Sequence, residues 1–168
     1  MKKLLLAVAL FGIVACQQNK IGFVNTVKVM TDYQEKIDVE AKYKIRGEAF
    51  AKKRDSISQI FQLEAQAFQA RAQKLSQSKA QEEYAVIQQK SQFIGQQLQQ
   101  EELALQQSSQ TEMDSLVSKV KEEIVVYGKA NNFTYVLSGG EGGSVLYGTE
   151  ANDITDAVLK ILNDKYKK

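Results

Sequence analysis

Apolar side chains recur at helical spacing through the long middle of the chain, among charges and glutamines. Between residues 43 and 75 they form two seven-residue series: Tyr43, Phe50, Ile57, then Phe61, Phe68, Leu75. A single a/d seam, of the kind that pairs helices in coiled coils, accounts for both series. A second seam follows between residues 84 and 127: Tyr84, Ile87, Ile94, Leu98, Leu105, Met113, Leu116, Val120, Ile124, Tyr127. The pattern predicts two long helices that pack along one apolar seam.

Neither seam continues through residues 76–80, whose sequence is SQSKA. We predict a reversal of the chain there, which makes residues 27–130 an antiparallel helical hairpin. The chain contains no proline, the residue that most often interrupts a helix. Each arm of about 50 residues would be roughly 75 Å long at 1.5 Å per residue.

Short β-prone runs flank the hairpin. Ile21–Val24 is short and apolar, and Phe133–Leu137 alternates aromatic and β-branched residues, so both predict strands. Ser138–Gly143 predicts a turn, with Ser144–Tyr147 as the partner strand of a β-hairpin. A last helix, capped by Asn152 or Asp153, has an apolar face: Ile154, Val158, Leu159, Ile161, Leu162.

The predicted fold class is α+β, mostly α, with a long antiparallel helical hairpin on a small β base and a C-terminal helix. Residues 1–15 form a signal segment, and residues 16–26 hold an anchor, a short linker and the first base strand. The hairpin arms take residues 27–130. Residues 131–168 supply the remaining base strands and the closing helix.

The first residues, MKKLLLAVALFGIVAC, have the layout of an export signal. Two lysines precede an apolar run that is shorter than the roughly 20 residues of a membrane-spanning helix. The run ends in Ile13-Val14-Ala15-Cys16, which resembles the bacterial lipobox, and Cys16 is the only cysteine. That resemblance implies a lipid on the Cys16 thiol. The alternative is an ordinary signal peptide in which Cys16 is incidental.

The two predicted arms carry opposite net charges, whereas the chain as a whole is nearly neutral. The formal net charge of +2 includes Lys2 and Lys3, without which 20 basic residues balance 20 acidic ones. A nucleic-acid partner is therefore not expected, because such proteins carry a basic field. Residues 28–79 carry 11 basic and 7 acidic residues, whereas residues 80–130 carry 4 and 8. Opposite net charges favour arms that lie side by side.

The residues for common enzyme chemistry are lacking. There is no histidine, so the usual general base and nitrogen metal ligand are missing. The glycine-rich run Gly139–Gly143 lacks the GK[ST] ending of a phosphate-binding loop. Paired glutamates such as Glu101 and Glu102 are neighbours on a helix and diverge by about 100°. We predict no catalytic residues, no metal site, no cofactor and no enzymatic activity.

The order of segments resembles the Skp/OmpH family of periplasmic chaperones. The resemblance lies in a first strand reading KIGFVN, a helical hairpin, a strand reading FTYVLSGG and a last helix reading DITDAVLKIL. It implies a homotrimer whose base contains six strand residues: Ile21, Phe23, Val24, Tyr135, Val136, Leu137. It also implies arms that hold unfolded outer-membrane proteins without ATP. The family type is strongly basic and soluble, whereas this mature chain is neutral and Cys16 indicates an anchor.

Two hypotheses about function remain open at this stage. The first is a periplasmic holdase, with the outer membrane preferred over the inner as its place of anchoring, and with seam aromatics that contact clients: Tyr43, Phe50, Phe61, Phe68. Packing between the two arms is the alternative role for these aromatics. The second hypothesis is a lipid-anchored coiled-coil spacer or adaptor in the periplasm.

Overall fold

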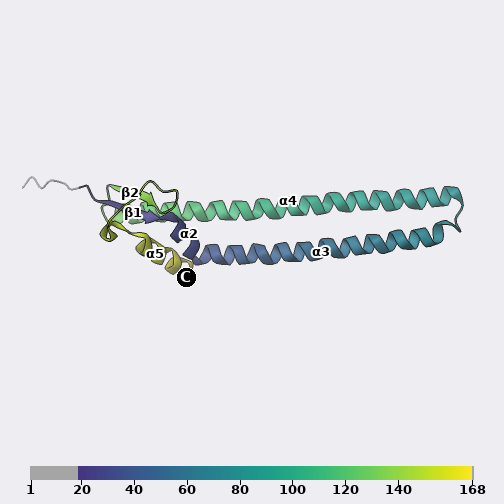
Figure 1. Ribbon diagram of the computed structural model, residues 1–168, viewed down its shortest axis with the longest axis horizontal. Helices are drawn as coiled ribbons and strands as arrows, with labels where there is room; N and C mark the ends of the chain where they lie inside the picture. The colour runs from purple at the N-terminus through teal and green to yellow at the C-terminus, as the bar shows by residue number, and fades with distance from the viewer. Residues whose placement is uncertain (1–18, 168) are drawn as a thin grey trace, which may run out of the picture.

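A computed structural model describes residues 19–167 (Figure 1). The predicted signal segment and Cys16 lie outside the described residues. In chain order the elements are β1 (Ile21–Asn25), α2 (Thr26–Asp32), α3 (Gln34–Ala72), α4 (Gln77–Ala130), β2 (Tyr135–Gly139), the 3-10 helix η1 (Glu150–Asn152) and α5 (Thr155–Tyr166). The predicted fold class is confirmed, since two long helices rise from a small base made of a sheet and a closing helix.

The hairpin consists of α3 and α4, which run side by side in opposite directions away from the base (Figure 1). They contain 39 and 54 residues, or about 58 and 81 Å of helix. Residues 73–76 connect them, slightly before the predicted turn. Ser76 caps α4, where its hydroxyl accepts a hydrogen bond from the Lys79 amide at 3.5 Å.

The first helical segment is broken at Tyr33, which the sequence pattern did not predict. Tyr33 has extended backbone angles of φ −71° and ψ 115°, and its side chain is buried. The next amide, that of Gln34, donates to Asn163 Oδ1 at 2.8 Å instead of to a helical carbonyl. The break lets α2 lie against α5 while α3 leaves the base as an arm.

The base sheet corrects the predicted β-hairpin. β1 and β2 pair in parallel, with Ile21 opposite Tyr135 and Asn25 opposite Gly139. The segment Ser144–Tyr147 forms no strand, and Val145 makes only an isolated bridge to Gly139. The hairpin prediction was wrong because, among the described residues, the segment after the turn bonds to β2 only through the Val145 amide and the Ser138 carbonyl. The full partner of β2 is β1, which a local alternation of side chains cannot reveal.

Apolar burial is concentrated in the base. Nine buried apolar residues form one cluster, drawn from β1, α2, the break at Tyr33, the start of α3, the end of α4, and α5 with the residue before it: Val24, Val29, Tyr33, Val39, Leu116, Val120, Ile154, Val158, Leu162. Farther out along the arms, ion pairs and a ring contact join α3 and α4 to each other. The structure therefore has a packed base and two arms that rely on their shared seam.

Candidate functional site: the arm surfaces and the base

The seam aromatics lie between the arms. Tyr43, Phe50, Phe61 and Phe68 are all half-buried. The Tyr43 hydroxyl lies 2.6 Å from Ser108 Oγ on α4, and the Phe68 ring lies 6.1 Å from that of Tyr84. These contacts favour the packing role for the aromatics, although each side chain keeps an exposed part. Contact with a client stays a prediction for these four residues.

Ion pairs join the two arms from the base to the tip. Within the described part of the chain, five such pairs link α3 to α4: Glu35–Lys119, Lys42–Glu112 (2.5 Å), Lys53–Glu101 (2.5 Å), Glu64–Lys90 (2.8 Å), Arg71–Glu83 (2.9 Å). The two residue numbers have the same sum in every pair, as expected for one constant antiparallel register. The pairs therefore fix which residues of the two arms lie at the same level.

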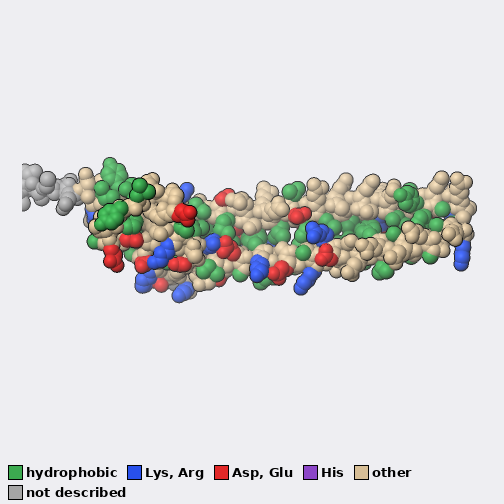
Figure 2. All heavy atoms as spheres, in the orientation of Figure 1, with side chains coloured by type: hydrophobic (Ala, Val, Ile, Leu, Met, Phe, Trp, Pro, Cys, Tyr) green, Lys and Arg blue, Asp and Glu red, His purple; other side chains and the backbone are tan. Residues whose placement is uncertain are grey.

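One stretch of the distal arms, short of the tips, is almost free of charge. Residues 56–70 of α3 and 84–100 of α4 contain one charged residue each, Glu64 and Lys90, and these pair with each other. Figure 2 shows charged side chains gathered over the base and the proximal half of the arms, whereas the distal face is mostly uncharged up to the tip. An uncharged surface of this length suits contact with a chain that carries no particular charge.

Large apolar side chains are exposed on this distal half. Ile60, Leu63, Val86 and Phe93 are exposed to 57%, 65%, 59% and 60%. Ile60 precedes Glu64 by four residues, and Val86 precedes Lys90 by four, so each is a helical neighbour of the ion pair. Phe93 follows Lys90 by three residues, and Leu63 follows Ile60 by three. We call these four residues around Glu64–Lys90 the distal patch.

A second apolar surface is exposed at the base. Leu146 is fully exposed and Tyr147 is 86% exposed. Both line a hollow together with Ile21 and Leu137, which are themselves partly exposed. Monomeric proteins seldom leave such residues together in water, and patches of this kind mark association surfaces.

The six predicted base residues fall into two groups. Val24 is buried in the core of the single chain, and Phe23 and Val136 are half-buried. Ile21, Tyr135 and Leu137 are exposed on the two paired strands. The exposed group remains available to another subunit, whereas Val24 serves the fold of its own chain.

A groove lies beside the second strand. It has a volume of about 420 Å³ and is lined mainly by apolar side chains of β2, α2 and α4, among them Met30, Val117, Ile124 and Val136. It lies next to the small sheet and shares Leu137 with the hollow that Leu146 and Tyr147 line.

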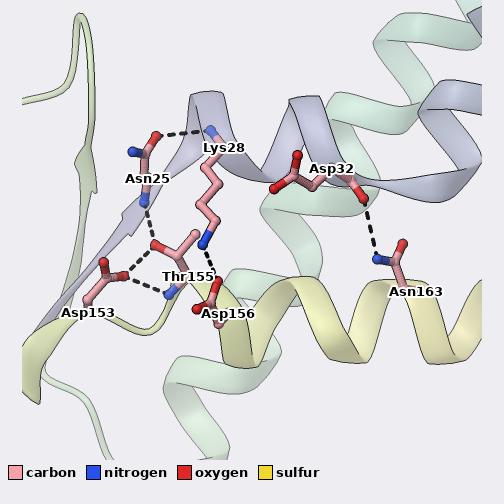
Figure 3. A network of polar contacts seen from close by, with 7 residues as sticks. All are labelled: Asn25, Lys28, Asp32, Asp153, Thr155, Asp156 and Asn163. Carbon is pink, nitrogen blue, oxygen red and sulfur yellow. Dashed lines mark hydrogen bonds and ion pairs between the residues drawn. The ribbon is translucent and has the colours of Figure 1, made fainter. Parts of the chain in front are cut away.

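Polar side chains tie the base elements together (Figure 3). The Thr155 hydroxyl accepts a hydrogen bond from the Asn25 amide at 2.8 Å and donates to the Asp153 carboxylate. The same carboxylate accepts from the Thr155 backbone amide at 2.9 Å, at the start of α5. Lys28 Nζ contacts Asp156 at 2.6 Å. The N-cap residue of α5 is Ile154 and not the predicted Asn152 or Asp153, but the Asp153 carboxylate still accepts from the first amide of the helix. The network holds β1 against α5.

Ionisable groups at the point where the arms leave the base shift one another's pKa values. Burial raises the pKa of the Tyr33 hydroxyl, and its hydrogen bond to Glu35 raises that pKa further. Burial would also raise the pKa of Glu35, but hydrogen bonds from Lys119 and Tyr33 outweigh it and lower that pKa. Both shifts stabilise a neutral tyrosine and an ionised glutamate, which is a structural arrangement and not that of a proton-transfer pair.

Residues 19–167 were searched for metal-binding clusters and for helices that could span a membrane. Residues 19–167 contain no cluster of three or more histidine, cysteine, aspartate or glutamate side chains that would hold a metal ion. Among the helices described, none is both long and apolar enough to cross a membrane. The exposed apolar residues of the arms and of the base form the candidate functional site, as two contact surfaces.

Sequence reasoning missed the distal patch and the Leu146–Tyr147 surface. The seam drew attention to residues at a and d positions, whereas Ile60, Leu63 and Phe93 lie off the seam. The usable signal was large apolar residues beside an isolated charge in an otherwise uncharged stretch. For Leu146 and Tyr147, the assumed hairpin had given both side chains a place in a sheet.

Comparisons with known proteins identify a family from the sequence and a shared fold from the structure. A family model described as outer membrane protein (OmpH-like) matches residues 20–162. A search of curated proteins finds no match. Among solved structures, a candidate outer membrane chaperone (OmpH-like) from Caulobacter crescentus CB15 aligns with a TM-score of 0.77 and 18% sequence identity. The alignment covers 92% of this chain and 89% of the other, so the two share a fold over nearly their whole length.

Proposed function

Because this chain belongs to the OmpH-like family, we propose that it is an ATP-independent holdase chaperone of the bacterial periplasm. In this proposal its clients are unfolded outer-membrane proteins. The chain carries no catalytic role and needs no cofactor. The observation that carries the proposal is the combination of long arms with large apolar residues left exposed along them.

The physical reason for such a surface is the nature of the client. An unfolded chain exposes apolar residues that aggregate unless another apolar surface covers them. A holdase must offer that cover and still stay in solution. The distal arms meet both needs, because Leu63 and Phe93 are exposed among glutamines and the two local charges neutralise each other.

A denatured outer-membrane β-barrel, diluted from urea, tests this function. We expect the full mature protein to suppress light scattering by the aggregating barrel at about stoichiometric amounts and without ATP. The same assay separates the proposal from a lipid-anchored spacer or adaptor, for which the paired arms are also suited. A chain that leaves the aggregation unchanged at a several-fold excess would reject the holdase and favour the spacer.

Self-association through the base is the second part of the proposal, with a homotrimer as the expected state. Two strands of five residues make a marginal sheet, and its edges invite pairing with neighbours. Leu146, Tyr147, Ile21 and Tyr135 supply exposed apolar area beside those edges. Covering this surface with other copies would place three pairs of arms on one base.

Leu146→Asp tests the base interface without touching the core of the single chain, because Leu146 is fully exposed. A buried aspartate at the interface should convert trimers into monomers, as measured by light scattering. Tyr84→Asp near the arm tips is the matched control and should remain trimeric. A trimeric Leu146→Asp protein with normal circular dichroism would argue against this surface.

Attachment to a membrane is the third part. A lipid on Cys16 would hold the base close to the bilayer, preferably the outer membrane, with the arms in the periplasm. Each buried acyl CH₂ contributes ~0.8 kcal/mol, so several chains anchor firmly. Cys16→Ser should move the protein from the membrane fraction to the soluble periplasmic fraction. Retention of the variant in the membrane would contradict a lipid anchor at Cys16.

A further inference from the structure

The distal patch has a composition that specifies its ligand more narrowly than an apolar surface alone would. It holds Ile60 and Leu63 on α3 and Val86 and Phe93 on α4, all more than half exposed. The arm register places residues 60–63 of α3 level with residues 91–94 of α4, so both helices contribute at one height. Ile60, Leu63 and Phe93 therefore lie at one level of the arms, and Val86 lies level with residue 68, nearer the tip.

The single ion pair in this region is internally compensated. Lys90 Nζ lies 2.8 Å from Glu64 and 5.5 Å from the centre of the Phe61 ring. The Lys90 ammonium group thus already has a carboxylate and an aromatic face as partners. Neither charge is left to select an acidic or a basic ligand, in contrast to the proximal arms with their dense charges.

The polar positions around the patch are dominated by glutamine, as at Gln59, Gln66, Gln89 and Gln97. A glutamine amide both donates and accepts hydrogen bonds without carrying charge. It can therefore pair with the backbone N–H and C=O groups that an extended chain leaves free. The patch and its glutamines therefore suit a ligand whose apolar side chains are flanked by unpaired backbone N–H and C=O groups.

We propose that the distal patch binds extended, uncharged polypeptide segments in which apolar residues alternate with neutral polar ones. Leu63 and Phe93 provide the central apolar contacts, and the surrounding glutamines bond the backbone. Recognition is independent of the net charge of the client and only weakly dependent on salt, since no unpaired charge takes part. This inference rests on the proposed holdase function and defines its client chemistry.

Three fluorescent peptides of equal length test the inference by anisotropy with the full mature protein. The first alternates Val or Tyr with Thr, and the other two replace every Thr by Asp or by Lys. We expect the uncharged peptide to bind most tightly and its affinity to change less than about twofold when salt is raised about tenfold. Tightest binding of either charged peptide, or a steep loss with salt, would overturn the proposal.

The double variant Leu63→Gln/Phe93→Gln should weaken binding of the uncharged peptide about tenfold or more, because two large apolar contacts are lost. Ile45→Gln is the matched control, since Ile45 is exposed to 66% but lies on the charged proximal arm. It should bind as the wild type does. Equal binding by the double variant, with helical content unchanged, would place the client elsewhere.

The barrel aggregation assay separates the two levels of the argument. If wild-type protein suppresses aggregation and the double variant does so equally well, the distal patch is rejected while the holdase function stands. If wild-type protein fails to suppress aggregation, the holdase function is rejected and the client inference falls with it.

Discussion

Thr155 ties the first strand to the last helix through a hydroxyl group that is almost completely buried. Only 2% of the residue is exposed, and the hydroxyl connects the Asn25 amide to the Asp153 carboxylate (Figure 3). No buried side-chain polar atom of residues 19–167 lacks a partner. A buried donor that loses its acceptor costs more than an ordinary hydrogen bond contributes.

Thr155→Val keeps the shape of the side chain and removes the hydroxyl. The Asn25 amide then loses its acceptor, so we expect the free energy of unfolding to fall by about 1–3 kcal/mol. Chemical denaturation followed by circular dichroism measures the change. Thr111→Val, at an exposed position of α4, is the control and should stay within about 0.5 kcal/mol of wild type. Equal stability of the two variants would show that Thr155 has no such role.

At the scale of elements, the spacing of the arm ion pairs matches two nearly straight helices that run side by side in opposite directions (Figure 1). Their members on α3 are spaced by seven, eleven, eleven and seven residues: Glu35, Lys42, Lys53, Glu64, Arg71. Steps of seven favour a left-handed supercoil and steps of eleven a right-handed one. Combined, they average about 3.6 residues per turn, which is that of a straight helix.

Charge reversal tests whether these pairs set the register. Lys42→Glu puts a second glutamate beside Glu112, and the repulsion should destabilise the proximal arms by about 0.5–1 kcal/mol. Adding Glu112→Lys restores an opposite pair and should recover most of that loss. Thermal unfolding of the single and double variants measures the coupling. A double variant no more stable than the single one would show that this pair contributes nothing specific.

The elements also show which information a single sequence holds. The arms were predictable because Tyr43, Phe50 and Phe61 repeat at helical spacing and carry the pattern locally. The break at Tyr33 and the parallel pairing of β1 with β2 were not, since both depend on partners more than 100 residues away in the chain. The opposite net charges of the arms predicted contact, but only the structure shows that Glu64 and Glu35 pair against that overall trend.

At the scale of the whole molecule, packing falls off from the base toward the tips. The core cluster includes Leu116 and Val120 near the base end of α4, with Ile124 and Tyr127 packed against it. Around the turn, Leu75 is only half-buried and Tyr84 is 52% exposed. Helical stability in proteins comes mainly from packing of an apolar face, so the tips should open more easily than the base.

Hydrogen exchange followed by mass spectrometry measures this gradient along the full mature protein. We expect amides at residues 75–84 to exchange at least about a hundredfold faster than those at residues 120–127, which corresponds to a difference of about 3 kcal/mol in opening free energy. Gly95 favours the same gradient, because a glycine in an exposed helix costs about 1 kcal/mol relative to alanine and a Cβ there would meet no neighbouring atom.

Gly95→Ala tests whether this glycine contributes to the gradient in amide exchange. It should slow exchange in the distal arms and leave residues 120–127 unchanged, since the substitution stabilises the helix without adding a contact. Arms that open at their tips can admit clients of different sizes, whereas a spacer between two structures needs stiff arms. Tip amides as well protected as those of residues 120–127 would therefore count against the holdase and support the lipid-anchored spacer.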